Sequence, residues 1–345
     1  MLLVAALGLA ACSSGTATAG PGSTTAGSGG GTGDGAVETL TIYSGRNENL
    51  VGPILEELGR VTGAEVEVRY AESSELAAQL LEEGEATDAD LFFSQDAGAL
   101  GALANAGRFE VLPADVLERV APSFRDAGGR WVATSARARV LAFDPAQAPE
   151  VAGFTGIDQI LDERFRGRIG YAPTNASFHS FVTALRVHRG EDGAREWLER
   201  FAALDPQAYG NNNAVLDAVN AGQVSVGLIN HYYWYERVAE QGADAVAARI
   251  RFLDSDDPGA LVNVAGVGVL AGTDAPDAAV AAVAHLLSDG VQQYFADETA
   301  EYPVVDGVTT ALHDLAPLGE GLAIDLNQLE SLAQTLALLD EVGLT

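Results

Sequence analysis

The chain has 345 residues, of which 48% are hydrophobic, and this is enough apolar material for two packed lobes rather than one small core. Its 49 acidic residues outnumber 19 basic ones, all of them arginine, and the net charge of -30 argues against a nucleic-acid partner because such a surface repels phosphates. The only cysteine, Cys12, excludes an internal disulfide and a metal site made of several thiolates.

The first 39 residues predict an export signal followed by a tether. Residues 1–11 are small and apolar and lead into the sequence LAAC, which resembles the lipobox of bacterial lipoproteins. Residues 12–39 are mainly Gly, Ser, Thr and Ala, which cannot bury enough apolar area to fold. We therefore expect residues 1–11 to be a lipoprotein signal peptide and Cys12 to carry the lipid. A plain signal peptide is the alternative, and because no basic residue precedes the apolar run, we expect the true start codon to lie upstream.

Strands and helices alternate in the first third of the folded part. Strands are predicted at residues 40–44, 64–70 and 90–94. Helices are predicted at 49–61, stopped by Thr62 and Gly63, and at 73–83, with Ser/Glu capping chemistry at its start. This order favours a parallel, doubly wound sheet.

The same alternation continues to the end of the chain. A strand at 168–172 is followed by a polar turn at 173–177 and a helix from Phe178 that ends within 197–204. The remaining predictions are a helix at 213–221, strands at 224–229 and 264–270, and helices at 278–288 and 326–339.

This element order predicts two α/β lobes joined by crossing strands, with a ligand in the cleft between them, outside the carboxyl ends of the strands. Functional residues should then lie on turns that follow strands. The turns to consider are 44–49, 94–98, 135–139, 173–177, 210–213 and 230–235.

An aromatic run, NHYYWY at residues 230–235, follows the predicted strand 224–229. In the first turn of a helix, Tyr232 and Tyr233 can reach the same space. A phenolate oxygen is a hard anionic donor that suits Fe³⁺, and a trivalent cation lowers the pKa of a phenol enough to bind it near neutral pH. An aromatic cluster that seals the interface between lobes is the alternative interpretation.

The run INHYYWY at 229–235 closely resembles the tyrosine motif of the periplasmic ferric-ion-binding proteins of ABC importers, and the resemblance extends from Leu40 to Thr345. Further matches in order along the chain are IYSGR at 42–46, ADLFF at 89–93, TSARARV at 134–140, DPGAL at 257–261 and EYP at 301–303. The resemblance implies a two-lobed, type II periplasmic-binding-protein fold with two doubly wound sheets and a hinge. It implies an N-lobe of residues 40–137 and 263–313 and a C-lobe of residues 138–262 and 314–345.

The resemblance also implies a site in which Tyr232 and Tyr233 bind Fe³⁺ as the transported ligand, beside phosphate or carbonate as a synergistic anion. Residues that match the anion pocket of the family are Asn175, Ala176, Ser177, Asn212 and Asn230. Arg137 or Arg139 could add a charge-assisted bond, and a helix N-terminus favours an anion. Simple helix capping is the alternative role of the Asn and Ser side chains.

The chain departs from the family at other ligand positions. Asn47 and Gln95 occupy the positions of a His and a Glu ligand, and Glu48 and Phe143 occupy those of two further tyrosines in some relatives. Asn47, Glu48 and Gln95 are therefore predicted, with the two tyrosines, as the metal-site residues. Because carboxylates suit hard cations, Glu48 is a candidate replacement, with Asp96 as a weaker one.

These residues predict an extracytoplasmic lipoprotein that acts as a monomer and delivers ferric iron to the permease and ATPase of an ABC importer. A small organic, phosphonate or thiamine-like solute on the same scaffold is the alternative, with the aromatic side chains stacking on the ligand. We expect no enzyme, because the sequence contains no ordered Ser/His/Asp set, phosphate loop or cysteine nucleophile.

Overall fold

The structure is a computed structural model of the chain that describes residues 38–310, 326, 329 and 331–345. The predicted signal peptide 1–11, Cys12 and all but the last two residues of the predicted tether 12–39 lie outside the described residues. So do residues 311–313 of the predicted N-lobe and residues 314–325 of the predicted C-lobe. Among the described residues, no helix has both the length and the apolar character required to span a bilayer.

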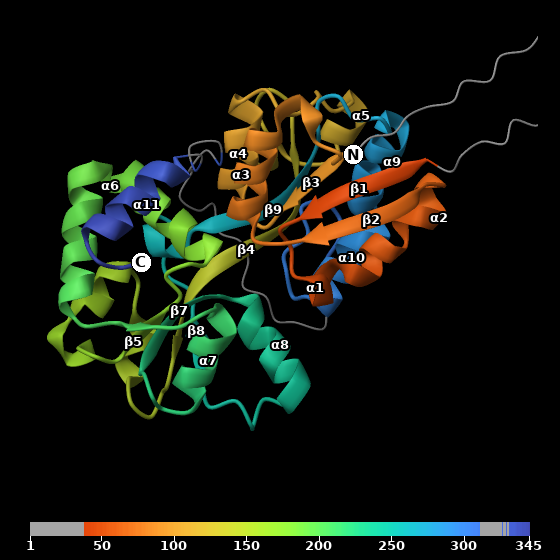
Figure 1. The fold of residues 1–345 in the computed structure, drawn as a ribbon. Helices are drawn as coiled ribbons and strands as arrows, with labels where there is room; N and C mark the ends of the chain where they lie inside the picture. The colour runs from red at the N-terminus through yellow and green to blue at the C-terminus, as the bar shows by residue number, and fades with distance from the viewer. Residues whose placement is uncertain (1–37, 311–325, 327–328, 330) are drawn as a thin grey trace, which may run out of the picture. The chain divides into compact units, whose positions relative to one another are not determined.

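The described residues form a nine-stranded sheet in which eight strands follow the order β2-β1-β3-β9-β4-β7-β5-β6, and the ninth, β8, pairs with β4 (Figure 1). Strands β1, β2 and β3 are parallel, and β9 runs antiparallel to β3. Strands β5, β6 and β7 are also parallel to one another. The bounds are β1 (Thr39–Ser44), β2 (Glu65–Tyr70), β3 (Leu91–Ser94), β4 (Val132–Phe143), β5 (Ile169–Tyr171), β6 (Gln207–Ala208), β7 (Val226–Asn230), β8 (Arg249–Arg251) and β9 (Val262–Val269).

Strand β4 connects the two groups of parallel strands. All twelve of its residues are buried; Val132 to Ala138 pair with β9, and Arg139 to Phe143 pair with β7. The predicted turn at 135–139 was therefore wrong, because this segment lies in the middle of the longest strand. The alternation of Arg and Ala there resembles an exposed turn in sequence, but both arginines are buried.

Helices follow most of the parallel strands. Their bounds are α1 (Glu48–Glu56), α2 (Leu58–Thr62), α3 (Ser73–Glu83), α4 (Ala97–Asn105), α5 (Ala114–Leu117), α6 (Ala176–Ala203), α7 (Asn212–Asn220), α8 (Tyr232–Gln241), α9 (Pro276–Leu286), α10 (Asp289–Glu298) and α11 (Leu332–Glu341). Short 3-10 helices are η1 (Gly84–Ala86), η2 (Pro122–Phe124), η3 (Pro149–Gly153), η4 (Ile157–Leu161), η5 (Glu163–Phe165) and η6 (Pro258–Ala260).

Several helix boundaries differ from the predicted ones. The predicted helix 49–61 is divided at Glu57 into α1 and α2. Helix α6 begins at Ala176, two residues before the predicted start, because the Asn175 side chain caps it by accepting a bond from the backbone N–H of Ser177. Helix α11 begins at Leu332 rather than 326.

The predicted capping by Ser73 was also wrong. Helix α3 has Glu72 at its N-cap, with no side-chain capping bond. The Ser73 hydroxyl instead accepts a bond from the backbone N–H of Gln95 at 2.8 Å and donates to the carbonyl of Gly45 at 3.4 Å. Ser73 therefore links α3 to the turns that follow β1 and β3.

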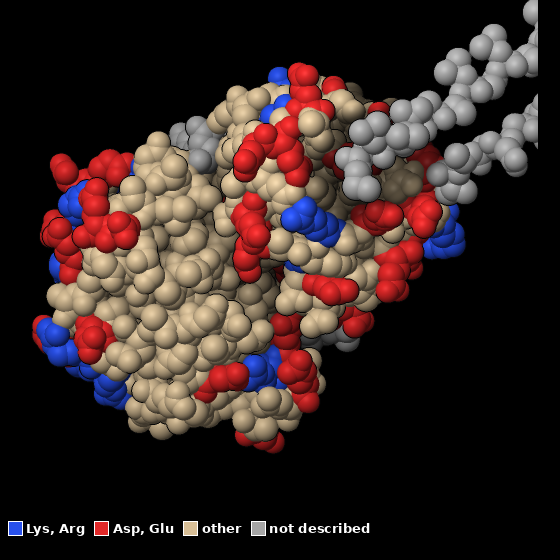
Figure 2. Space-filling view, in the orientation of Figure 1, with Lys and Arg blue, Asp and Glu red and all other residues tan. Residues whose placement is uncertain are grey.

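Separate apolar cores lie on the two sides of the β4 crossing. The first surrounds β1, β3 and β9 and includes Trp131, Phe92 and Phe93, together with Leu326 and Leu329. The second surrounds β5 and α6, where Trp197 stacks on Phe201 with ring centroids 5.2 Å apart. A third, smaller cluster packs α7 against β7. Acidic side chains outnumber basic ones on the face shown in Figure 2, as the net charge requires.

Candidate metal-binding site

The two tyrosines of the aromatic run begin helix α8 directly after strand β7. The rings of Tyr232 and Tyr233 lie 4.2 Å apart between centroids, tilted by 32°. Tyr232 is buried and Tyr233 is half-buried. The start of the helix therefore brings both phenol oxygens into one space.

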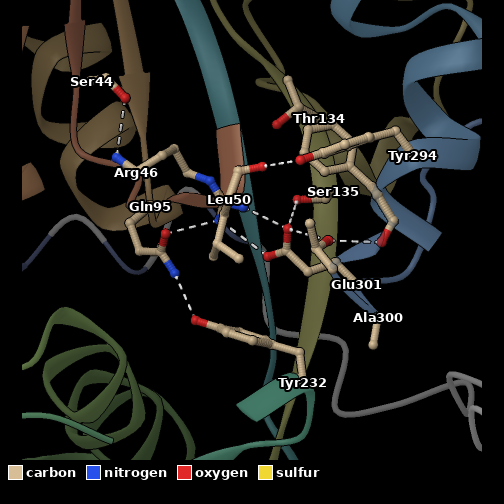
Figure 3. Close-up of polar contacts among 12 residues, drawn as sticks. Ser44, Arg46, Leu50, Gln95, Thr134, Ser135, Tyr232, Tyr294, Ala300 and Glu301 are labelled. Carbon is tan, nitrogen blue, oxygen red and sulfur yellow. Dashed lines mark hydrogen bonds and ion pairs between the residues drawn. The ribbon is translucent and has the colours of Figure 1, made fainter. Parts of the chain in front are cut away.

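Gln95, in the turn after β3, reaches Tyr232 from another part of the sheet (Figure 3). Its amide nitrogen Nε2 donates to the Tyr232 hydroxyl at 3.3 Å, and its Oε1 accepts a bond from Arg46 at 2.8 Å. Arg46 in turn forms a two-pronged ion pair with Glu301, at 2.5 and 3.1 Å. In this arrangement, Arg46 fixes the orientation of the Gln95 amide, so that a donor rather than an oxygen faces the phenol.

Glu301 is buried and well satisfied. In addition to Arg46, it accepts a bond from the Ser135 hydroxyl at 3.1 Å (Figure 3). This carboxylate has its charge matched by the Arg46 guanidinium, whose side chain is also inaccessible to solvent.

Two further arginines of β4, Arg137 and Arg139, are buried beside the tyrosines, and neither forms an ion pair within the described part of the chain, although the charges of Asp96 and Glu301 act on Arg137. Arg137 is 1% exposed, and none of its three guanidinium nitrogens has a hydrogen-bond partner among the described residues. The two terminal nitrogens of Arg139 also lack one there, although this guanidinium lies 5.8 Å from the centroid of the Phe181 ring. Burial lowers the pKa of both arginines; the charge of Arg46 lowers that of Arg137 further, and the charge of Arg137 lowers that of Arg139 further. Because a guanidinium starts from so high a pKa, both remain charged at neutral pH.

The predicted anion-pocket residues are brought together at the N-termini of α6 and α7. Asn175 Oδ1 accepts bonds from the Ser177 backbone and from Asn212 Nδ2, at 3.0 and 3.2 Å. Asn230 Nδ2 donates to the Ser177 hydroxyl at 2.9 Å, and Asn230 is the register partner of Arg139 across β7 and β4. Ala176 is the first residue of α6. Asn212 also lowers the pKa of Tyr233, which places this polar group near the tyrosine pair.

The electrostatic environment keeps both phenols protonated in the metal-free protein. Burial raises the pKa of Tyr232 and of Tyr233, and the positive charge of Arg137 opposes that rise. A metal that binds these oxygens must therefore displace their protons.

Glu236 is a functional candidate that the sequence reasoning missed. It lies in α8, one turn beyond the tyrosines, and its Oε1 is buried with no hydrogen-bond partner among the described residues. Burial raises the pKa of its carboxyl to about 8, and the charges of Glu301 and Arg46 also act on it. The signal that could have found it is its spacing of three and four residues from the tyrosine pair, which places all three side chains on one helix face.

The neighbouring His231 is not available as a ligand in this arrangement. Its Nδ1 accepts a bond from the Ala138 backbone N–H at 3.2 Å, and its Nε2 bonds the Ala300 carbonyl at 2.8 Å. Burial lowers the pKa of His231 to about 4, so the ring is neutral and the proton lies on Nε2. The histidine holds the start of α8 against β4.

Asn47 and Glu48 lie at the beginning of α1, and the described structure records no hydrogen bond or ion pair between them and the tyrosines. Asn47 is exposed and caps α1 by accepting from the Asn49 backbone at 2.9 Å. Glu48 is exposed and lines a surface cavity of about 670 Å³ together with Tyr70.

Asp96 and Phe143, the other two residues considered near the ligand positions of the family, have structural roles. Asp96 caps α4 by accepting from Ala99 at 3.1 Å, and burial raises its pKa. Phe143 is packed in the second core. Among residues 38–310, 326, 329 and 331–345, no three His, Cys, Asp or Glu side chains form a metal-binding group.

A two-lobed α/β fold in which polar side chains on turns after several strands converge is the architecture of a type II periplasmic binding protein. The chain belongs to the family of bacterial extracellular solute-binding proteins, whose family model matches residues 87–322.

Known relatives and solved structures to which the chain is similar include several iron-binding proteins. The chain is 32% identical, over 287 residues, to the major ferric iron-binding protein of Neisseria meningitidis serogroup B, covering 83% of this chain and 86% of that protein. It is similar to iron-bound HitA from Pseudomonas aeruginosa, with a TM-score of 0.83 and 32% identity over 89% of this chain and 99% of that chain. It is also similar to a Trichodesmium protein in complex with iron and citrate, with a TM-score of 0.75 and 25% identity over 89% of this chain and 100% of that chain.

Proposed function

We propose that this protein captures ferric iron outside the cytoplasm and delivers it to an ABC importer, and that Tyr232 and Tyr233 bind the metal. The observation that carries the proposal is the pair of adjacent phenols, with ring centroids 4.2 Å apart, beside two buried arginines whose terminal guanidinium nitrogens have no hydrogen-bond partner among the residues that the structure describes. Relatives that are named for ferric iron support it.

The chemistry of this donor set fits Fe³⁺. Phenolates are hard, anionic oxygen ligands, and a trivalent cation compensates for the cost of removing their protons. Fe³⁺, Arg137 and Arg139 together carry more positive charge than two phenolates can neutralise. A further anion is therefore needed at the site. We expect phosphate or carbonate at the N-terminus of α6, where Asn175, Ser177 and the arginines supply donors.

Gln95 contributes through Tyr232. In the described arrangement its Nε2 donates to the Tyr232 oxygen, and this bond becomes charge-assisted when the phenol is deprotonated. Asn47 and Glu48 remain predicted ligands only if the turn after β1 moves when iron binds.

A different solute on the same scaffold is not favoured. Stacking on a small organic or phosphonate ligand would use the faces of Tyr232, Tyr233 and Trp234, but Trp234 Nε1 is bonded to the Ala248 carbonyl at 2.8 Å. The relatives reported above are iron proteins.

The remaining parts of the proposal concern the whole protein. The predicted lobes are residues 40–137 with 263–313 and residues 138–262 with 314–345, although Leu326 and Leu329 pack in the first core, with the N-lobe strands. The lobes close around the metal by hinge motion. The protein acts as a monomeric binding protein, not as an enzyme. Its partners are the permease and ATPase of the importer, and Cys12 anchors it by lipid to the outer face of the cytoplasmic membrane.

The direct test is the visible spectrum of the protein titrated with Fe³⁺ in the presence of phosphate. We expect a phenolate-to-iron charge-transfer band that is abolished when Tyr232→Phe and Tyr233→Phe are combined. Tyr209→Phe, a half-buried tyrosine next to β6, is the matched control and should keep the band. A wild-type protein that stays colourless while folded would contradict the proposal.

A further inference from the structure

The metal site proposed above lacks a carboxylate at the position where the family resemblance expects one. Gln95 occupies that position, and its Oε1 accepts a 2.8 Å bond from Arg46. Rotating this oxygen toward a metal would leave the buried Arg46 nitrogen without that acceptor. The chain therefore needs another source of anionic oxygen if Fe³⁺ is to have more than its two phenolates and a small anion.

Two carboxylates have charges that act on the tyrosine pair, Glu301 on Tyr232 and Glu236 on Tyr233. Glu301 is already satisfied by Arg46 and Ser135. Taking Glu301 for a metal would break this buried ion pair and leave the Arg46 charge uncompensated, which is strongly destabilising.

Glu236 has no such commitment. It lies three residues after Tyr233 and four after Tyr232 in α8, so the three side chains share one face of the helix. Side chains of a helix lean toward its N-terminus, and a glutamate one turn later therefore leans back over the first turn, where the tyrosines lie.

The environment of the Glu236 carboxylate indicates which way it faces. Its Oε1 is buried without a hydrogen-bond donor among the described residues. The charges of Glu301 and Arg46, which come from the segment after α10 and from the turn after β1, act on it together with those of Glu240 and Arg237 of its own helix. Glu236 is half-buried, and its buried Oε1 lies within electrostatic range of the Arg46 and Glu301 pair that holds Gln95. A buried carboxylate oxygen without a donor is costly, and a bound cation would relieve that cost.

We propose that Glu236 is a ligand of the ferric ion, so that the protein binds Fe³⁺ through two phenolates and one carboxylate of a single helix, α8. This inference rests on the proposed function. The carboxylate ligand then comes from α8, on the C-terminal side of the tyrosine pair. It does not come from the turn after β3, where Gln95 lies.

The test compares Glu236→Gln with Glu240→Gln in the full protein. Glu240 lies one turn further along α8, is exposed, and lies 3.7 Å from Arg237. Both substitutions replace a carboxyl group of the same helix with an amide of nearly the same shape. Affinity for Fe³⁺ is measured by competition with nitrilotriacetate in the presence of phosphate, together with the visible spectrum and the melting temperature of the metal-free protein.

Glu236→Gln should keep the charge-transfer band and bind Fe³⁺ on the order of 10–100-fold more weakly, as expected when a group that supports a metal is lost. Its band should move to longer wavelength, because iron with one fewer anionic donor accepts charge from phenolate more easily. The metal-free variant should melt at or above the wild-type temperature, since a buried carboxylate without a donor has been removed. Glu240→Gln should match wild type in affinity and band.

Several results would overturn the inference while leaving iron binding by the tyrosines intact. These are an unchanged affinity and band in Glu236→Gln, an equal loss in Glu240→Gln, or a loss of affinity with an unshifted band and a lower melting temperature. The last result would assign Glu236 a structural role. A wild-type protein with no band at all would overturn the proposed function and this inference together.

Discussion

At the residue scale, guanidinium groups dominate the electrostatics of the candidate site. Arg46 is paired with Glu301, whereas Arg137 and Arg139 are buried without an anion. An isolated buried charge is tolerated only at a cost to stability, and functional sites are common places for such a cost. The unpaired arginines are therefore best explained by an anion that arrives with the metal.

This explanation predicts opposite effects for two substitutions. Arg137→Met removes three buried nitrogens that lack partners, so the free energy of unfolding of the metal-free protein should rise by about 1–3 kcal/mol. Arg46→Met leaves the buried Glu301 carboxylate without its ion-pair partner, and the free energy of unfolding should fall by about 3–5 kcal/mol. Urea denaturation measures both.

In the presence of phosphate, Arg137→Met should also bind Fe³⁺ more weakly, because the synergistic anion loses a donor. A metal-free Arg137→Met protein that is less stable than wild type would contradict the view that Arg137 serves to bind an anion rather than to stabilise the metal-free fold.

Sequence reasoning could identify the tyrosines and the Asn and Ser residues of the polar group, because each lies in a short run directly after a predicted strand. It could not find the orientation of Gln95. That orientation depends on Arg46 and Glu301, which are 255 positions apart in the chain. The burial of Glu236 likewise follows from tertiary packing rather than from its neighbours in sequence.

At the scale of elements, the turn after β1 is fixed by close packing against α3. The Gly45 backbone N–H donates to the Phe93 carbonyl at 2.8 Å. A Cβ at Gly45 would lie 2.8 Å from the backbone Cα of Ser73, which is closer than ordinary contacts allow. Because Ser73 also holds the backbone of Gln95, this glycine supports the positions of both Arg46 and Gln95.

Gly45→Ala should therefore displace Ser73 and the turn, lowering the free energy of unfolding by about 1–3 kcal/mol. The same variant should bind Fe³⁺ less tightly. Gly52→Ala is the matched control, since its Cβ would meet only a flexible side-chain atom of Glu48, at 3.9 Å. Alanine inside α1 should stabilise the protein by about 0.5–1 kcal/mol and leave binding unchanged. Equal effects of the two substitutions in urea denaturation would contradict the packing argument.

Most strands and helices could be predicted from hydrophobic periodicity, including α3 with both of its bounds. Strand β4 could not, because a buried strand that carries Arg137 and Arg139 has the composition of an exposed turn. The division of the predicted helix 49–61 at Glu57 also lacks a clear local signal.

At the scale of the whole molecule, the acidic surface and the predicted tether fit a protein that works outside the cytoplasm near its importer. The net charge of -30 favours solubility and raises the local concentration of cations only diffusely, so selectivity must come from the site. A flexible tether keeps the binding protein at a high effective concentration near the permease.

Cys12→Ser should release the protein from the membrane fraction while leaving Fe³⁺ binding by the purified protein unchanged. Cell fractionation and immunoblotting measure the release, with Ser14→Ala as a control that should stay membrane-bound. Iron uptake by cells should fall with Cys12→Ser and vanish when the permease is deleted. A Cys12→Ser protein that remains in the membrane fraction would refute the lipid anchor.

The claim that the phenols of α8 bind ferric iron is tested most directly by diffraction from crystals of the iron-loaded protein, with data collected at the iron absorption edge. The account predicts a single strong anomalous peak within bonding distance of the hydroxyl oxygens of both Tyr232 and Tyr233. An anomalous peak elsewhere on the protein, with the Tyr232 hydroxyl still hydrogen-bonded to Gln95, would contradict it.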